Sequence, residues 1–269
     1  MAYREWGDPT NPRVLLCLHG LTRAGSDFNV VARGMSDQFR VICPDIAGRG
    51  ASDRLRQPMF YGVPHYANDV ATLLAVVDAK QLNVLGTSMG GLIGIVLAGL
   101  PGSPIEKLLI NDIGPVTDPL GVSRIAEYVG KDPRWATADE GVTYLNSLTK
   151  NFGPNSAEHC DALNRPLITH YADGWGLHYD PALATPFKAV TPELMAAAEK
   201  SLWHSWEQIS AKVLITRGVS SDVLQREVME QMVRRGQSVR AVEFPDTGHA
   251  PAFLVQSQLS VARSFFVED

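Results

Sequence analysis

Short apolar runs recur along the chain, and most are apolar at every position rather than at alternate positions. They are rich in Val, Ile and Leu, which favours strands. A strand that is apolar on both sides is typical of a parallel sheet covered by helices on both faces. The predicted strands are Val14–Leu18, Val41–Cys43, Leu82–Leu85, Leu108–Ile110, Val213–Thr216 and Val239–Phe244.

Segments with helical spacing separate these runs. His65–Ala79 and Ser88–Leu100 carry apolar residues three and four positions apart, as a helix packed on a sheet requires. Pro251–Phe265 has the pattern of a closing helix. Because strands and helices alternate, the sequence predicts an α/β fold with an open, mostly parallel twisted sheet flanked by helices.

The alternation breaks between about Pro119 and Trp206, where no convincing strand is found and aromatic residues are frequent. Since this segment is too long for a loop, we expect a helical cap over one end of the sheet. The predicted cap helices are Val122–Val129, Ala138–Lys150, Ala157–Tyr171 and Pro192–Trp203. The chain is thus divided into a core of residues 1–118 and 207–269 and a cap of residues 119–206. Most of the aromatic residues are expected to form the small core of the cap, and the others to line a pocket.

Composition narrows the classes of protein to which the chain can belong. Its 269 residues are 45% apolar and 20% charged, as in soluble globular proteins. A formal net charge of −5 without a Lys/Arg stripe argues against a nucleic-acid surface. The start MAYREWGDPT lacks signal-peptide features, and the longest apolar stretch, residues 91–100, is too short to cross a bilayer. We expect a cytoplasmic protein without nucleic-acid or membrane partners, and the sequence leaves a homo-oligomer open.

The sequence Gly-Thr-Ser-Met-Gly at residues 86–90 places Ser88 between a predicted strand and a predicted helix. This context is that of a nucleophile elbow. Gly86 and Gly90 lack side chains, so strand and helix can approach closely around a sharp turn. Ser88 would then lie at a helix N-terminus, where free amides favour a negative charge. Because a hydroxyl is a weak nucleophile, a base and an acid that orients the base are needed.

His249 is the candidate base, because it alone among the histidines follows the last predicted strand and precedes the last predicted helix. The candidate acid is Asp222, just past the strand Val213–Thr216, whose loop would carry its carboxylate toward the imidazole. Asp112 is a rival, because it also ends a predicted strand. Spacing alone favours Asp222 without excluding Asp112.

Two backbone amides are candidates for an oxyanion hole. Gly20 allows a tight turn after the strand Val14–Leu18, which would expose the amide of Leu21. Together with the amide of Met89, which follows the nucleophile, it would bind the developing negative oxygen. His19 directly follows a buried strand, so we interpret it as a structural histidine and not as a catalytic residue or metal ligand.

Four stretches together resemble the α/β-hydrolase family. They are HGLTRAGSDF at 19–28, PDIAGRGASD at 44–53, GTSMGG at 86–91 and DTGHAP at 246–251. The resemblance covers essentially the whole chain except the cap, and it implies an eight-stranded sheet with a lid after the sixth strand. Only thirteen residues precede Val14, where the family usually has two strands. We therefore expect one strand at Ala2–Trp6 and a first strand that is missing or shortened.

The family pattern also implies the roles of individual residues. Ser88 would be the nucleophile, Asp222 the acid and His249 the base. The form RGxxSDxL at 217–224 resembles the acid loop of one branch of the family, which favours Asp222 over Asp112. The Gly-Arg-Gly turn within residues 44–53 is usually structural, so Arg49 receives no chemical role.

A serine-histidine-carboxylate set implies acyl transfer to water through an acyl-enzyme, without a metal or organic cofactor. The aromatic cap favours small or medium carboxylic esters as the small-molecule substrates. A C–C bond hydrolase of meta-cleavage products is the alternative, although Thr87 stands where that branch often has asparagine. A lactonase, a thioesterase or a perhydrolase would use the same residues. A non-catalytic small-molecule-binding protein of this fold is the alternative from another class.

Overall fold

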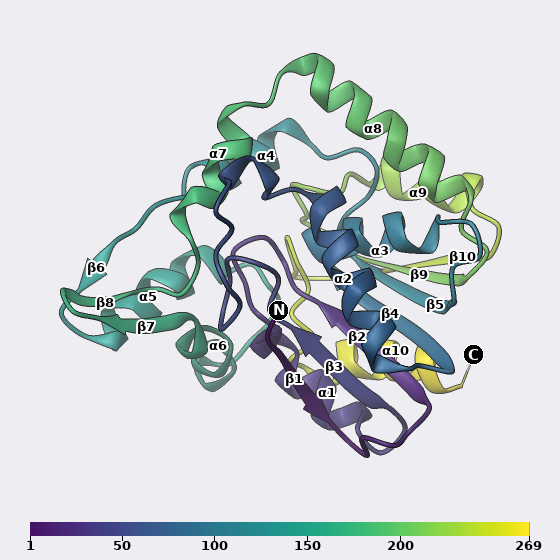
Figure 1. Cartoon of the computed structure of the whole chain (residues 1–269), viewed down its shortest axis with the longest axis horizontal. Helices are drawn as coiled ribbons and strands as arrows, with labels where there is room; N and C mark the ends of the chain where they lie inside the picture. Colours follow the sequence, from purple (N-terminus) through teal and green to yellow (C-terminus); the bar gives the residue numbers. More distant parts are fainter. Residues whose placement is uncertain (269) are drawn as a thin grey trace.

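The computed structural model describes residues 1–268, and its centre is a seven-stranded sheet (Figure 1). The strands are β1 (Tyr3–Trp6), β2 (Arg13–Leu18), β3 (Arg40–Pro44), β4 (Gln81–Thr87), β5 (Ile105–Asn111), β9 (Lys212–Gly218) and β10 (Val239–Phe244). Their order across the sheet is β1-β3-β2-β4-β5-β9-β10. The edge strand β1 runs antiparallel to β3, and the other pairs are parallel. Each of the six strands predicted from apolar runs lies within an observed strand.

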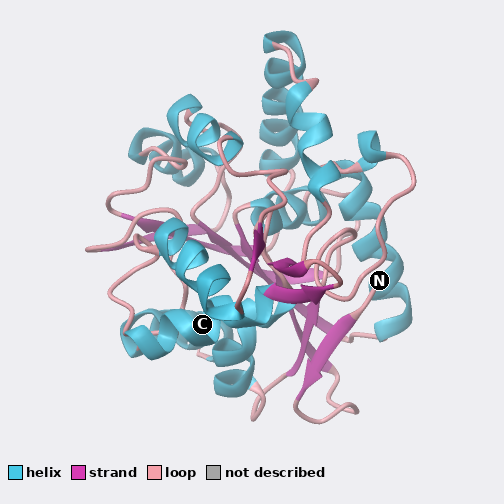
Figure 2. Ribbon diagram, turned by 90° about the vertical axis from the view of Figure 1, so that its left-hand side faces the viewer, coloured by secondary structure: helices cyan, strands magenta, loops and turns pink. Residues whose placement is uncertain are grey.

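Helices cover both faces of this sheet (Figure 2). Those that pack around it are α1 (Asn29–Met35), α2 (Val63–Val77), α3 (Met89–Ala98), α8 (Pro192–Glu207), α9 (Arg226–Arg235) and α10 (Gln256–Val267), with short 3-10 turns η1 (Gly25–Phe28) and η2 (Pro58–Phe60). Successive side chains of a strand point to opposite faces, so β2 supplies Val14, Leu16 and Leu18 to one core and Leu15 and Cys17 to the other. The first core includes residues of α2, α3, α8 and α9, and the second those of α1 and α10. A sheet covered on both faces explains why its strands are continuously apolar.

The N-terminal edge agrees with the expectation from the sequence. The strand β1 pairs Tyr3 with Pro44 and Trp6 with Val41. Within the described residues no strand precedes it, so the sheet has seven strands instead of the family's eight. This edge lies far from the carboxyl ends of β4 and β5, where the candidate site is found.

The segment between β5 and β9 differs from the helical cap that was predicted. It contains α4 (Pro119–Ala126), β6 (Arg134–Trp135), α5 (Ala138–Thr149), α6 (Ala157–Asn164), η3 (Arg165–Leu167), β7 (Ile168–Tyr171), β8 (Gly174–Leu177), η4 (Pro181–Leu183), α7 (Ala184–Lys188) and α8. The strands β6, β8 and β7 form a small antiparallel sheet at the left of Figure 1. The prediction of no strand in this segment was therefore wrong, as was the extension of a helix from Ala157 to Tyr171. Gly174, at φ +127°, allows the tight connection between β7 and β8.

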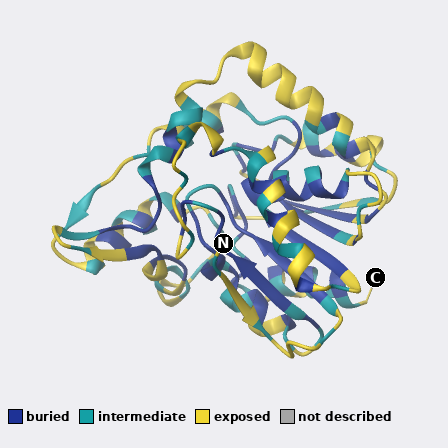
Figure 3. Cartoon of the chain, in the orientation of Figure 1, coloured by how far each residue is buried: buried dark blue, intermediate teal, exposed yellow. Residues whose placement is uncertain are grey.

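The last helix of this segment, α8, packs on α3 of the core. Gly99 at the end of α3 makes this approach close, since a Cβ there would overlap the backbone of Ser205. On the same helix Trp206 is fully buried, and its Nε1 donates a hydrogen bond to the carbonyl oxygen of Met232 at 3.2 Å. Figure 3 shows that much of the outer surface of α8 is exposed. No helix among the described residues is long and apolar enough to cross a membrane.

Candidate active site

Ser88 occupies a sharp turn between β4 and α3. Its backbone is at φ 53° and ψ −118°, a strained conformation for a residue with a side chain. A Cβ on Gly86 would overlap the backbone of Gly90, and one on Gly90 would overlap the carbonyl group of Leu18. The two glycines therefore allow the close packing of strand and helix that the sequence predicted. The turn presents the Ser88 hydroxyl at the carboxyl end of the sheet.

His249 lies on the loop after β10 and reaches Ser88 across the sheet. Its Nε2 is 2.9 Å from the Ser88 Oγ, and its side chain is 8% exposed. The structure thus brings together two residues that are 161 positions apart in the sequence. A neutral imidazole with its proton on Nδ1 can accept the hydroxyl proton at Nε2.

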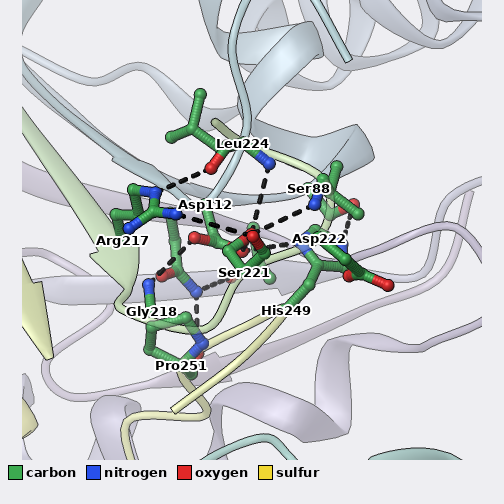
Figure 4. Close-up of polar contacts among 12 residues, drawn as sticks. Ser88, Asp112, Arg217, Gly218, Ser221, Asp222, Leu224, His249 and Pro251 are labelled. Carbon is green, nitrogen blue, oxygen red and sulfur yellow. Dashed lines mark hydrogen bonds and ion pairs between the residues drawn. The ribbon is translucent and has the colours of Figure 1, made fainter. Parts of the chain in front are cut away.

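Asp112 is the carboxylate that orients this imidazole (Figure 4). It directly follows β5, and its Oδ2 is 2.8 Å from His249 Nδ1. The carboxylate is fully buried and accepts two further hydrogen bonds, from the Gly218 amide at 2.9 Å and from the Ser221 hydroxyl at 2.6 Å. Its backbone is also in the left-handed region, at φ 58°. A buried anion with three donors is a well-held partner for a histidine.

The structure contradicts the expected placement of Asp222 against His249. Its two carboxylate oxygens accept hydrogen bonds from Nε and Nη2 of Arg124 at 2.5 and 2.9 Å. Both side chains are 39% exposed, and this pair lowers the pKa of Asp222. The physical reason lies in its neighbour, because Ser221 is the residue of this loop whose side chain reaches Asp112. The RGxxSDxL stretch thus approaches the histidine indirectly, through Ser221 and Asp112.

The two amides predicted for an oxyanion hole lie on segments next to Ser88. A Cβ on Gly20 would be 3.7 Å from the Ser88 Cβ, which places the turn that carries Leu21 beside the nucleophile. Met89 is the first residue of α3. Within residues 1–268 neither amide donates a hydrogen bond to another protein group. Both are therefore free to bind an oxygen of a ligand.

Arg49 connects these two segments, a role that was not predicted from the sequence. Its guanidinium is fully buried and donates from Nε to the Leu21 carbonyl oxygen at 2.8 Å. Its Nη2 lies 3.5 Å from the Met89 sulfur, and its Nη1 donates to the hydroxyl of Tyr66. Burial lowers the pKa of Arg49. No local pattern reveals such contacts, since they join residues 28 and 40 positions apart.

His19 is a structural residue, as the sequence predicted. Its Nδ1 donates to the Gly20 carbonyl oxygen at 2.7 Å, and its Nε2 accepts from the Ile46 amide at 2.9 Å. Burial lowers the pKa of His19 to about 3, so the ring is neutral. His178, from the segment after β8, has the same property, with a pKa of about 3 and a hydrogen bond from the Gly50 amide to its Nδ1.

Comparison with known proteins gives the family. The model of the alpha/beta hydrolase family matches residues 15–259. The chain belongs to this family. It is 50% identical to the 3-hydroxybutyrate-oligomer hydrolase of Cupriavidus necator over 270 residues, which cover 99% of this chain and 92% of that protein. The relatives therefore support a hydrolase.

Two solved structures have the same fold. An alpha/beta hydrolase from Novosphingobium aromaticivorans superposes with a TM-score of 0.84 at 29% identity, over 98% of this chain and 93% of that chain. E-2-(acetamidomethylene)succinate hydrolase has a TM-score of 0.83 at 19% identity, over 98% and 94% of the two chains. The second likeness concerns the fold alone.

A cavity of about 70 Å³ lies over Ser88 and His249 in this hydrolase. Its walls come from the loop after β2, from α4 and α5, and from the stretch that follows His249. Tyr128 and Phe152 are the two aromatic residues of the 119–206 segment that line it. The helix predicted to begin at Pro251 begins only at Gln256, where α10 starts, so the stretch directly after His249 is not helical. Asn111 instead holds it by donating to the Pro251 carbonyl oxygen at 2.8 Å.

An arginine lies in the wall of the cavity beside the turn of Leu21. Arg23 donates to both carboxylate oxygens of Asp27 at 2.8 and 2.9 Å, and to the Asn164 side chain at 2.8 Å. Burial raises the pKa of Asp27, while Arg23 opposes the rise. The arginine thus ties the 119–206 segment to the core. Within the described part of the chain, no group of three His, Cys, Asp or Glu residues could hold a metal ion.

Proposed function

We propose that this chain is a serine ester hydrolase that cleaves oligomers of 3-hydroxybutyrate. The observation that carries the proposal is the continuous chain of hydrogen bonds from Ser88 through His249 to Asp112. The substrate class is taken from the relative that shares half of its residues with this chain over nearly its whole length. A short ester of a hydroxy acid is compatible with the small cavity at Ser88.

The geometry supports an acyl-enzyme mechanism. His249 Nε2 takes the proton of Ser88 as its oxygen attacks the ester carbonyl, and the carbonyl oxygen becomes an oxyanion. The amides of Leu21 and Met89 would stabilise this oxyanion. The tetrahedral intermediate then breaks its bond to the alcohol oxygen, which receives the proton from His249. Water repeats the sequence on the acyl-enzyme, releasing the acid and restoring the Ser88 hydroxyl.

Asp112 has a separate task in this mechanism. Its carboxylate accepts a hydrogen bond from the Nδ1–H group of His249, which fixes the tautomer that leaves Nε2 free to accept a proton. When the imidazole becomes positively charged, the buried carboxylate at 2.8 Å stabilises it. Asp222 is not assigned this role, because its carboxylate is occupied by Arg124.

We also propose that the segment of residues 119–206 acts as the cap of the active site. Its helix α5 contributes Leu148 to the cavity wall, while Tyr128 follows α4 and Phe152 follows α5. These side chains would exclude water and limit the length of the acyl group.

An assay of substrates separates this proposal from the alternatives. The purified protein is incubated with the 3-hydroxybutyrate dimer and trimer, with p-nitrophenyl butyrate and with a meta-cleavage dienoate. We expect release of 3-hydroxybutyrate and of nitrophenol, and no cleavage of the dienoate. Cleavage of the dienoate without ester hydrolysis would establish the C–C reaction instead. A single burst of nitrophenol without turnover would indicate a binding protein.

A further inference from the structure

A second cavity, of about 360 Å³, adjoins the active-site cavity. Four residues line both of them: Arg124, Tyr128, Leu148 and His249. We call this second cavity the lysine groove. Among the residues that line it are Arg124, Glu127, Lys131, Lys150, Asp222 and His249. Its lysines follow α4 and α5, and its aspartate lies on the loop after β9.

The lysine groove carries an excess of positive charge. Asp222 is bound by two nitrogens of Arg124, so these two charges offset each other. Lys131 and Lys150 are exposed, and neither forms an ion pair with an acid within residues 1–268. Glu127 is the one other acid in the wall. A carboxylate that entered the groove would therefore meet two lysines that form no ion pair within the described part of the chain.

The path of the proton in the proposed reaction indicates which part of the substrate lies next to the lysine groove. In the mechanism proposed above, the alcohol oxygen that leaves receives its proton from His249 Nε2. The leaving group must therefore lie against His249. Ser88 lines only the active-site cavity, whereas His249 lines both cavities. The acyl group would thus occupy the first cavity, and the leaving alcohol would extend toward the lysine groove.

We propose that the lysine groove binds the leaving group and selects alcohols that carry a carboxylate. This inference rests on the proposed ester hydrolysis. A 3-hydroxybutyrate unit at the carboxyl end of an oligomer is such an alcohol, because its carboxylate lies just beyond the leaving oxygen. Lys131 and Lys150 attract that carboxylate, while Arg124, which lines both cavities, is held by its ion pair with Asp222. The groove thus favours cleavage that releases the terminal unit with its free acid.

The test compares two substrates that differ only in the charge of the leaving group. These are the 3-hydroxybutyrate dimer and the same dimer with its carboxylate converted to a primary amide. The ratio of their kcat/KM values is measured for the unaltered protein, for Lys131→Gln, for Lys150→Gln and for the double variant. Lys200→Gln is the matched control, because Lys200 is an exposed lysine of α8 outside both cavities.

We expect the unaltered protein to prefer the acid by about threefold to tenfold, since exposed charge pairs have small energies. The double variant should bring the ratio close to one, and Lys200→Gln should keep it. The preference should also decrease at high ionic strength, where exposed charges are screened. Equal rates for the acid and the amide, or a preference that the double variant keeps, would overturn the inference while ester hydrolysis stands. Hydrolysis of neither dimer would instead refute the proposed function, and the inference with it.

Discussion

The replacement Asp112→Asn tests which carboxylate serves His249. In the structure Asp112 is fully buried and 2.8 Å from His249 Nδ1, so asparagine removes the charge that stabilises the imidazolium. It also allows the wrong tautomer, because an amide can donate to Nδ1. In a comparable triad the same change lowers kcat by about 10⁴-fold, which corresponds to about 5 kcal/mol of activation free energy. We expect a loss of this order.

Asp222→Asn is the matched comparison. It weakens an ion pair whose two members are 39% exposed, and such a pair contributes about 0.2 to 1 kcal/mol. Even if loss of the ion pair raised the activation free energy by the full 1 kcal/mol, kcat would fall by about fivefold at most. The two isosteric variants should therefore differ by roughly a thousandfold in rate.

The assay is steady-state hydrolysis of p-nitrophenyl butyrate between pH 5 and 9, with thermal unfolding of each variant as the control for folding. The control matters because Asp112 also accepts from Gly218 and Ser221, and the asparagine amide loses one of these bonds. A folded Asp112→Asn variant within tenfold of the unaltered rate would refute the reasoning. So would a larger loss in Asp222→Asn than in Asp112→Asn.

Three further predictions concern the supports of the site. Arg49→Lys should lower kcat by about tenfold with little change in KM, and should weaken binding of a boronic-acid transition-state analogue. The reason is that a single ammonium group cannot contact both the Leu21 carbonyl oxygen and the Met89 sulfur as the guanidinium does. Unchanged kcat and analogue affinity would contradict it. The folded-state pKa of His178, about 3, lies below the unfolded value of about 6.5. The unfolded state therefore binds more protons between these pH values, and the contribution of His178 to the free energy of unfolding falls as the pH drops through this window, by at most about 1.4 kcal/mol per unit. Urea unfolding of His178→Asn should show a smaller pH slope than the unaltered protein, and an equal slope would contradict the prediction. Gly90→Ala should cost about 1 to 3 kcal/mol of stability through overlap with the carbonyl group of Leu18, whereas Gly34→Ala, with open space around it, should not; thermal unfolding of both variants checks this.

The fold could be predicted from the sequence because strands that are buried on both faces of the sheet are apolar at every position. Runs such as Val14–Leu18 are apolar throughout only if both sides of the strand are covered. The segment of residues 119–206 was harder to predict, because its strands are short and partly exposed. The pair β7 and β8 is joined by a tight turn before Gly174, and this turn was the available signal for a hairpin.

Spacing in the sequence was not enough to predict which carboxylate pairs with His249. Asp112 and Asp222 both follow strands that end at the same edge of the sheet, and spacing in the sequence favoured Asp222, the residue that the structure places away from His249. Two details decide between them: Ser221 turns toward Asp112, and Arg124 of α4 takes Asp222. In the structure β5 is the immediate neighbour of β4 in the sheet. A residue at the end of β5 must lie beside Ser88.

The central claim is that Ser88 attacks an ester of 3-hydroxybutyrate and carries its acyl group. The most direct measurement is release of 3-hydroxybutyrate from its dimer by the unaltered protein and by Ser88→Ala, with mass spectrometry of the protein after a fluorophosphonate label. We expect turnover and a label on Ser88 in the unaltered protein, and in the folded variant neither label nor a rate above about a thousandth of the original. An inert unaltered protein, a label on another residue, or an active Ser88→Ala variant would contradict the account.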